Sequence, residues 1–208
     1  MNMTNILIVG VGGQGTLLAS KVLGNLALAA GYDVKVSELH GMAQRGGSVA
    51  THVRFGENVQ APLIDEGGAD VILAFEALEA ARCLNYLKPG GTVIVNDQRI
   101  LPMPVILGAA QYPDDILDTL EKNAGAVVCI DAARIARECG NARVLNVVLL
   151  GVLSRCLGGF AADWEAALQK TVKPQFLDVN LAAFARGYAI GPQTAGHDNP
   201  DPEYEEET

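Results

Sequence analysis

The sequence predicts an α/β protein with a Rossmann-like, mostly parallel sheet flanked by helices, and with a helical C-terminal section. Short apolar segments rich in β-branched residues alternate with segments of helical period, which is typical of βαβ units. The first apolar segment ends in a glycine-dense turn. Half of the 208 residues are hydrophobic and only 5% are aromatic, with 23 glycines, a composition that favours tightly packed layers over a β-sandwich.

The first 40 residues show the pattern of a βαβ unit, in which a strand, a helix and a second strand follow one another. Residues 5–10 form an apolar run predicted to be a strand buried on both faces. Residues 16–30 have helical spacing and stop at Gly31, and residues 33–38 alternate as a second strand. We expect the two strands to be parallel with a right-handed crossover. Alternation over residues 49–55, followed by the turn signal FGEN, predicts a strand with one exposed face or a hairpin.

The rest of the chain continues the alternation and then becomes helical. Strands are predicted at 70–75, 92–96 and 126–130, and helices at 76–87, at 113–124 and from the capping residue Asp131 to Cys139. Further helices are predicted at 143–157, 163–172 and 174–188. We divide the chain into one domain, residues 1–190, and an acidic tail, residues 191–208, whose composition is typical of disorder.

Charge and apolar patterning exclude several classes of function. The formal net charge is −9, but six acidic residues follow Arg186, the last basic residue, so the body carries only about −3. A nucleic-acid-binding face needs clustered Lys and Arg, which the sequence lacks. It also shows no secretion signal and no apolar run of membrane-spanning length. We therefore expect a cytoplasmic protein that binds neither nucleic acid nor membrane.

The cysteines do not predict a metal centre. Cys83, Cys129, Cys139 and Cys156 are widely spaced and form no C-x-x-C motif, so an iron–sulfur cluster or a structural zinc site held by this chain alone is poorly supported. We expect ordinary buried or half-buried thiols in a reducing compartment.

The turn after the first strand has the spacing of a dinucleotide-binding fingerprint. Gly10 permits a tight exit from the strand, Gly12 removes a side chain where backbone meets ligand, and Gly15 lets the helix pack closely. The following helix N-terminus favours a phosphate. An NAD site also needs a carboxylate on the second strand, for which Glu38, 23 residues after Gly15, is the candidate. The same glycines would equally serve strand-to-helix packing or contact with another chain.

A second glycine-rich motif, SELHGMAQRGGSVATHVRFG, follows where a dehydrogenase continues with its next crossover helix. Its Arg45 is suited to pair with a phosphate or a carboxylate; the alternative is a solvated turn with a surface arginine. His40, His52 and His197 have no metal-ligand spacing. His52 is predicted to be an exposed strand residue and not a general base, and we predict no catalytic residue.

Taken together, these two motifs and a later NVVLLGVLSR segment around Asn146 resemble the gamma-type domain of 2-oxoacid:ferredoxin oxidoreductases, and within that family the branch that acts on indolepyruvate. The resemblance covers about residues 5–190. It implies a subunit that supports oxidative decarboxylation of an aryl 2-oxoacid with coenzyme A to an acyl-CoA, CO2 and reduced ferredoxin. A large alpha subunit would carry thiamine diphosphate and the iron–sulfur clusters, and ferredoxin would meet the complex.

The resemblance also implies where the chain meets a cofactor, with coenzyme A as the candidate. The residues expected to contact it are Gly10, Gly12, Gly13, Gln14, Gly15, Thr16, Glu38, Gln44, Arg45, Gly46 and Gly47. The family's second signature further includes Ser37, Gly41, Met42 and Ala43. No metal ligand is predicted. Two other hypotheses stay open: an NAD-linked oxidoreductase with Glu38 on the ribose, and an interaction module whose glycines only pack against a partner.

Overall fold

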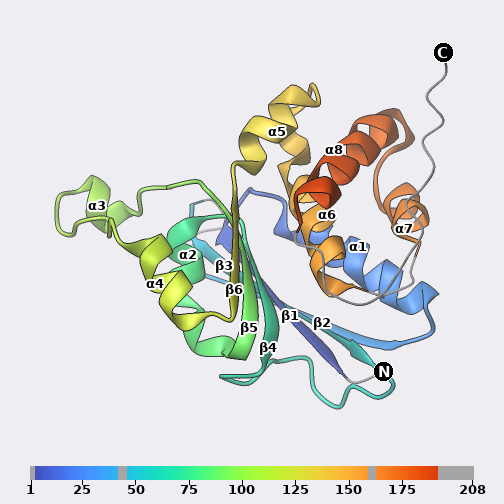
Figure 1. Cartoon of the computed structure of the whole chain (residues 1–208), viewed down its shortest axis with the longest axis horizontal. Helices are drawn as coiled ribbons and strands as arrows, with labels where there is room; N and C mark the ends of the chain where they lie inside the picture. Colours follow the sequence, from blue (N-terminus) through green and yellow to red (C-terminus); the bar gives the residue numbers. More distant parts are fainter. Residues whose placement is uncertain (1–2, 42–45, 159–162, 192–208) are drawn as a thin grey trace.

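The fold is a six-stranded mixed sheet with helices on both faces (Figure 1), which confirms the predicted α/β class. The structure is a computed structural model that describes residues 3–41, 46–158 and 163–191. The strand order is β2-β3-β1-β4-β5-β6. The strands are β1 (Thr4–Val11), β2 (Asp33–His40), β3 (Ser48–Gly56), β4 (Ala69–Ala74), β5 (Leu87–Asn96) and β6 (Ala126–Ile130).

The strand β3 changes the expected arrangement of the first βαβ unit. Strands β1, β4, β5 and β6 are parallel neighbours, but β3 lies between β1 and β2 and is antiparallel to both. β1 and β2 therefore run in the same direction, as predicted, without being paired. β3 forms a hairpin with β2, the strand before it, and not across the FGEN turn that suggested a hairpin. The prediction of one exposed face for β3 is wrong, because neighbours on both edges and covering segments on both faces leave most of its residues buried.

The helices form two unequal layers around this sheet (Figure 1). One face carries α1 (Thr16–Ala29), α5 (Ala132–Glu138), α6 (Leu145–Leu157), α7 (Trp164–Thr171) and α8 (Leu177–Ile190), and the other carries α2 (Ala77–Arg82) and α4 (Ile116–Asn123). Successive side chains of a strand point to opposite faces. Accordingly, Ile6 and Ile8 of β1 pack in the cluster under α1, whereas Leu7 and Val9 pack in the cluster under α2.

The larger differences from the predictions are three shifted boundaries and one additional helix. The helix predicted to reach Leu87 ends at Arg82 and is followed by a 3₁₀ turn, Leu84–Tyr86. Strand β5 starts at Leu87 and not at residue 92. Helix α4 starts at Ile116, after the N-cap residue Asp115, and the short helix α3 (Met103–Ile106) was not predicted. Two further 3₁₀ turns, Ala142–Val144 and Pro174–Phe176, precede α6 and α8.

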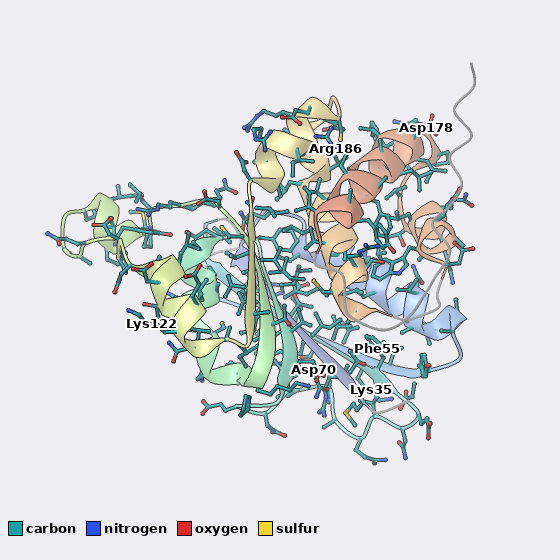
Figure 2. All side chains as sticks on the ribbon, in the orientation of Figure 1. Lys35, Phe55, Asp70, Lys122, Asp178 and Arg186 are labelled. Atoms are coloured by element: carbon teal, nitrogen blue, oxygen red, sulfur yellow. The ribbon has the colours of Figure 1, made fainter. Side chains whose placement is uncertain are left out.

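Helices α6 and α8 pack with their backbones in contact. A Cβ atom added at Gly187 of α8 would overlap the carbonyl oxygen of Val148, and one added at Gly151 of α6 would overlap the carbonyl oxygen of Phe184. Arg186 also joins α8 to α5, because its guanidinium donates to Glu138 Oε2 at 2.7 Å (Figure 2). The two glycines thus set the distance between the helices of the C-terminal section.

His52 is buried, with 2% of its surface exposed, so the predicted exposed position is wrong. It lies on β3 facing the connection between β3 and β4, whose Ile64 N–H donates to His52 Nδ1 at 3.1 Å. The Tyr86 ring meets the imidazole edge-on at a centroid distance of 5.9 Å. Burial, and to a smaller extent the charge of Arg54, lowers the pKa of His52. The alternation of β3 did not reveal this covering segment, which comes from later in the chain.

The lowered pKa of His52 predicts a loss of stability in mild acid. The unfolded chain takes up this proton near pH 6.5 and the folded chain only at lower pH. The contribution to the free energy of unfolding is therefore complete above about pH 6.5 and declines as the pH falls from there toward the folded pKa. His52→Asn keeps an acceptor for Ile64 and cannot titrate, so its stability should fall less between pH 7.5 and 5.5. The free energy of unfolding is measured by urea unfolding at both pH values. An equal loss in the two proteins would contradict a lowered pKa of His52.

Candidate functional site

The carboxyl ends of β1, β2, β4 and β5 lie at one edge of the sheet, and the two glycine motifs meet there. The chain leaves β1 at Val11 and enters α1 at Thr16. Gly13 and Gly15 have φ angles of +102° and +91°, which favour glycine. A Cβ at Gly15 would lie 2.7 Å from Asn146 Nδ2 of α6. The absence of that Cβ lets α6 approach the start of α1, a contact between helices, whereas the sequence predicted close packing of a helix on the strand.

Three hydrogen bonds within the chain hold the Gln14 side chain in place. Its Oε1 accepts from Val11 N–H at 2.7 Å, and its Nε2 donates to the carbonyl of Phe75 at 3.0 Å and to Gln98 Oε1 at 3.2 Å. Both amide hydrogens are thereby engaged. A Cβ at Gly10 would lie 2.8 Å from Gln14 Oε1, so Gly10 makes room for this side chain. Gln14 therefore joins the ends of β1, β4 and β5 at the base of the turn.

The second motif contacts the first through the backbone. Gly12 N–H donates to the carbonyl of Gly47 at 2.9 Å, and Gly41 N–H to the carbonyl of Ser48 at 3.2 Å. The described ends of the second motif, up to Gly41 and from Gly46 on, thus lie beside the glycine turn. Met42, Ala43, Gln44 and Arg45 fall outside the described residues. An anion partner for Arg45 accordingly stays a prediction.

Glu38 lies on β2, two strands away from the glycine turn. In the register Ile8, Thr51 and Glu38 are directly opposite one another across β1, β3 and β2, which places Glu38 about 10 Å from β1 at two strand spacings. Its Oε1 lies 3.1 Å from His40 Nδ1. Its Oε2 and the Thr51 Oγ1 are buried without a hydrogen-bond partner in the described part of the chain. In a dinucleotide-binding fold the ribose carboxylate ends the strand next to β1; here β3 takes that place.

Two buried carboxylates at the same edge were not predicted. Glu76 is 1% exposed and caps α2, with Oε2 accepting from Glu79 N–H at 2.9 Å. Its Oε1 accepts from Ile100 N–H at 3.1 Å and from Tyr112 Oη at 2.6 Å. Burial and this contact with Glu76 raise the pKa of Tyr112 above its usual range. Glu79 accepts from the Ser48 hydroxyl. The only sequence signal was an acidic residue between a strand and a helix, a common capping position.

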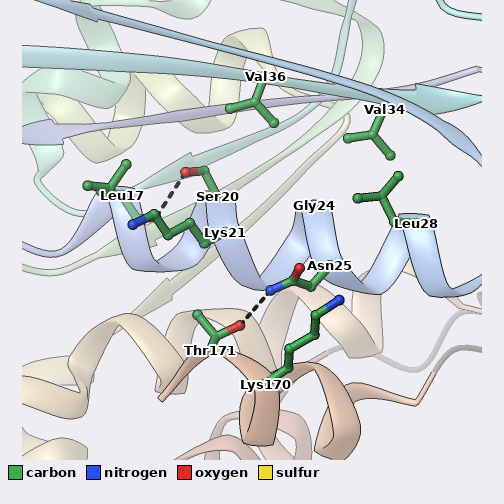
Figure 3. A pocket seen from close by; sticks show the side chains of 10 residues that line it. All are labelled: Leu17, Ser20, Lys21, Gly24, Asn25, Leu28, Val34, Val36, Lys170 and Thr171. Atoms are coloured by element: carbon green, nitrogen blue, oxygen red, sulfur yellow. Dashed lines mark hydrogen bonds between the residues drawn. The ribbon is translucent and has the colours of Figure 1, made fainter. Parts of the chain in front are cut away.

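Two hollows lie in the helix layer that contains α1. A groove of about 650 Å³ runs between α1, β2 and α7 (Figure 3). Apolar side chains of Leu28, Val34 and Val36 line it, with Lys21 and Lys170 beside them. A second hollow of about 440 Å³ lies between α1, α6 and α8 and is lined in part by Asn146. Neither is lined by a residue that the sequence assigned to cofactor contact.

The cysteines and the acidic side chains form no metal site in the part of the chain described. There, no three His, Cys, Asp or Glu side chains come close enough together to hold an ion. Burial raises the pKa of the Cys83 and Cys156 thiols to about 11 in each case. Cys129 is exposed on β6, contrary to the prediction of a buried or half-buried thiol. Over the same residues, every helix is too short or too polar to cross a membrane.

The sheet with its glycine turn, joined to a glycine-rich hairpin, defines a Rossmann-like domain, a class of fold in which ligands bind at the carboxyl ends of the strands. The model of the family described as "Pyruvate ferredoxin/flavodoxin oxidoreductase" matches residues 5–190, and the chain belongs to this family. The resemblance read from the two motifs is thereby confirmed.

A relative agrees with this membership, and two solved structures share the fold. The indolepyruvate oxidoreductase subunit IorB of Thermococcus kodakarensis is 44% identical over 94% of this chain and 100% of the relative. Pyruvate oxidoreductase subunit PORC of Thermotoga maritima has a similar fold, with a TM-score of 0.67 and 24% identity over 91% of this chain and 97% of that one. The 2-oxoglutarate:ferredoxin oxidoreductase of Magnetococcus marinus matches 91% of this chain but only 31% of its own, with a TM-score of 0.65 and 20% identity.

Proposed function

We propose that the chain is the small subunit of an indolepyruvate:ferredoxin oxidoreductase. The reaction it supports is the oxidative decarboxylation of an aryl 2-oxoacid with coenzyme A, giving an acyl-CoA, CO2 and reduced ferredoxin. The observation that carries the proposal is the 44% identity with a subunit IorB over that relative's entire length. A match of this extent includes both glycine motifs and the helices that pack behind them.

In this proposal the redox chemistry belongs to a larger alpha subunit. That subunit holds thiamine diphosphate and the iron–sulfur clusters, and the assembled complex transfers electrons to ferredoxin. The cysteines fit this division, because in the described part of the chain none of them belongs to a group of three or more close His, Cys, Asp or Glu side chains, and cluster ligands have to converge. The chain itself would stay without a catalytic residue and supply structure, docking and part of a cofactor pocket.

We place contact with coenzyme A at the glycine turn and the adjoining hairpin turn. Helix α1 has 14 residues and no side-chain cap at its N-terminus, so its first N–H groups and its dipole favour a phosphate. Gly13 has open space around it, since no atom lies within 4 Å of an added Cβ. Gln14 supports the turn from behind, and Gly46, Gly47 and Arg45 would complete the contact from the hairpin.

The isolated chain is expected to show no 2-oxoacid oxidation, since the proposal places the carbanion-stabilising cofactor and the electron acceptors on the alpha subunit. Co-expression with the alpha subunit should give indolepyruvate oxidation that depends on coenzyme A, measured with ferredoxin or a viologen dye. The alpha subunit alone is the matched control. Turnover by the purified small chain alone would contradict the proposal.

Calorimetric titration of the purified small chain with NAD tests the alternative of an NAD-linked oxidoreductase. The position of β3 between β1 and β2 removes the usual ribose partner, so we expect no saturable binding of NAD. A dissociation constant in the low micromolar range that is lost in Glu38→Ala would favour an NAD-linked oxidoreductase instead.

A further inference from the structure

Residues 97–115, which connect β5 to α4, form an apolar projection that we call the 97–115 arm. Figure 1 shows its helix α3 standing away from both helix layers. Four large apolar side chains on the arm are at least half exposed: Leu101 (51%), Met103 (61%), Ile106 (60%) and Leu107 (73%). Adjacent apolar side chains this exposed are typical of a surface that is covered in an assembly.

The arm is built to hold its shape without a partner. Within it, Ile106 N–H donates to the carbonyl of Pro102 at 3.1 Å, and Ala109 N–H to the carbonyl of Pro104 at 2.8 Å. Its two ends are fixed by Glu76, which accepts from Ile100 N–H and from Tyr112 Oη. An apolar surface that is already ordered loses less conformational entropy when it binds.

The chemistry of the arm indicates what covers it. From Ile100 to Tyr112 the sequence contains no charged residue, which matches the depletion of charge in the centre of protein interfaces. A charged ligand or an acidic or basic peptide would find no counter-charge there. The complementary surface is therefore an uncharged, apolar recess.

The place of the arm indicates which chain provides that recess. The arm leaves the carboxyl end of β5, next to the glycine turn, and Gln98 at its root accepts from Gln14 Nε2. It is thus continuous with the edge where the proposed function places coenzyme A, which has to meet the thiamine diphosphate that the same proposal assigns to the alpha subunit. In the Magnetococcus marinus enzyme the matching region makes up 31% of one longer chain, so a module of this fold can be joined permanently to its enzyme. Permanent interfaces are more apolar than transient ones.

We propose that the 97–115 arm inserts Ile106 and Leu107 into an apolar recess of the larger alpha subunit and is a main docking element of the complex. This inference rests on the proposed function, because that function supplies the partner.

The test compares two equally exposed apolar sites in the full chain mixed with the alpha subunit. Ile106→Asp/Leu107→Asp places two charges on the arm and should weaken binding at least about tenfold, measured by sedimentation or biolayer interferometry. The melting temperature of the small chain alone should stay unchanged, because both side chains are exposed. Leu28→Asp, at a residue 59% exposed beside the α1 groove, is the matched control and should bind as the unmodified chain does.

Three outcomes overturn the inference. Unchanged binding of Ile106→Asp/Leu107→Asp excludes the arm as the docking element. Loss of binding in Leu28→Asp alone makes the α1 groove the interface. A dimer of the unmodified small chain that the arm variant abolishes assigns the arm to a second copy of this chain. Failure of the unmodified chain to bind the alpha subunit is a separate result, which refutes the proposed function and the inference with it.

Discussion

Gly187→Ala is expected to lower the free energy of unfolding by about 3 kcal/mol or more, which is at or above the usual cost of overpacking a core. The added methyl group would overlap the backbone carbonyl of Val148. A backbone atom inside a helix cannot rotate away, so α6 and α8 must separate along their contact. Urea unfolding monitored by circular dichroism measures the loss directly.

Gly24→Ala is the matched control for this substitution. Gly24 is also a glycine within a helix, α1, but no atom lies within 4 Å of an added Cβ. Alanine should therefore raise stability by about 0.5–1 kcal/mol through helix propensity. A Gly187→Ala protein as stable as the unmodified chain would show that the two helices do not pack at this distance.

Glu76→Ala is expected to cost about 2 to 4 kcal/mol, because it leaves the buried N–H group of Glu79, the partly buried N–H group of Ile100 and the Tyr112 hydroxyl without their acceptor. The loss should be concentrated in the 97–115 arm, whose two ends Glu76 holds. Limited trypsin digestion reports on this region, since Arg99 lies at the root of the arm. Cleavage after Arg99 should be faster in Glu76→Ala than in the unmodified chain.

Tyr112→Phe provides the comparison, because it removes one of the three hydrogen bonds and keeps the ring. We expect a loss of about 1 kcal/mol and a small change in cleavage after Arg99. If Glu76→Ala and Tyr112→Phe lose the same stability, the two backbone contacts of Glu76 contribute nothing and the arm is held by other means.

The parts of the fold that the sequence predicted are those encoded by local periodicity. Strand β6 and the capping of α5 by Asp131, which accepts from Arg134 N–H, were predicted at their observed positions. The place of β3 was not, because alternation shows that a segment is a strand but not which strands flank it. Helix α3 was missed because its four residues, Met103–Ile106, are too few to show a helical period.

The candidate site came from the family resemblance and not from periodicity, and cofactor contact at the two glycine motifs stays a prediction. What the structure adds is the hydrogen bond from Gly12 to Gly47, which brings the described ends of the two motifs together. The role of Gln14 needed the three-dimensional structure, since its partners Phe75 and Gln98 lie 61 and 84 residues away in the sequence. Glu38 was assigned to a ribose on spacing alone, which could not reveal the strand inserted beside it.

The insertion of β3 also determines which strands of the sheet open first. β1 is bonded to neighbours on both edges and is buried from Ile6 to Val11, whereas β2 is an edge strand with one neighbour. Local opening starts where contacts are fewest, so amide hydrogens of β2 should exchange with solvent long before those of β1. Gly47 directly precedes β3, which has neighbours on both edges, so the Gly12 to Gly47 hydrogen bond lies on the slowly opening side of the hairpin, and β2 can detach without breaking it.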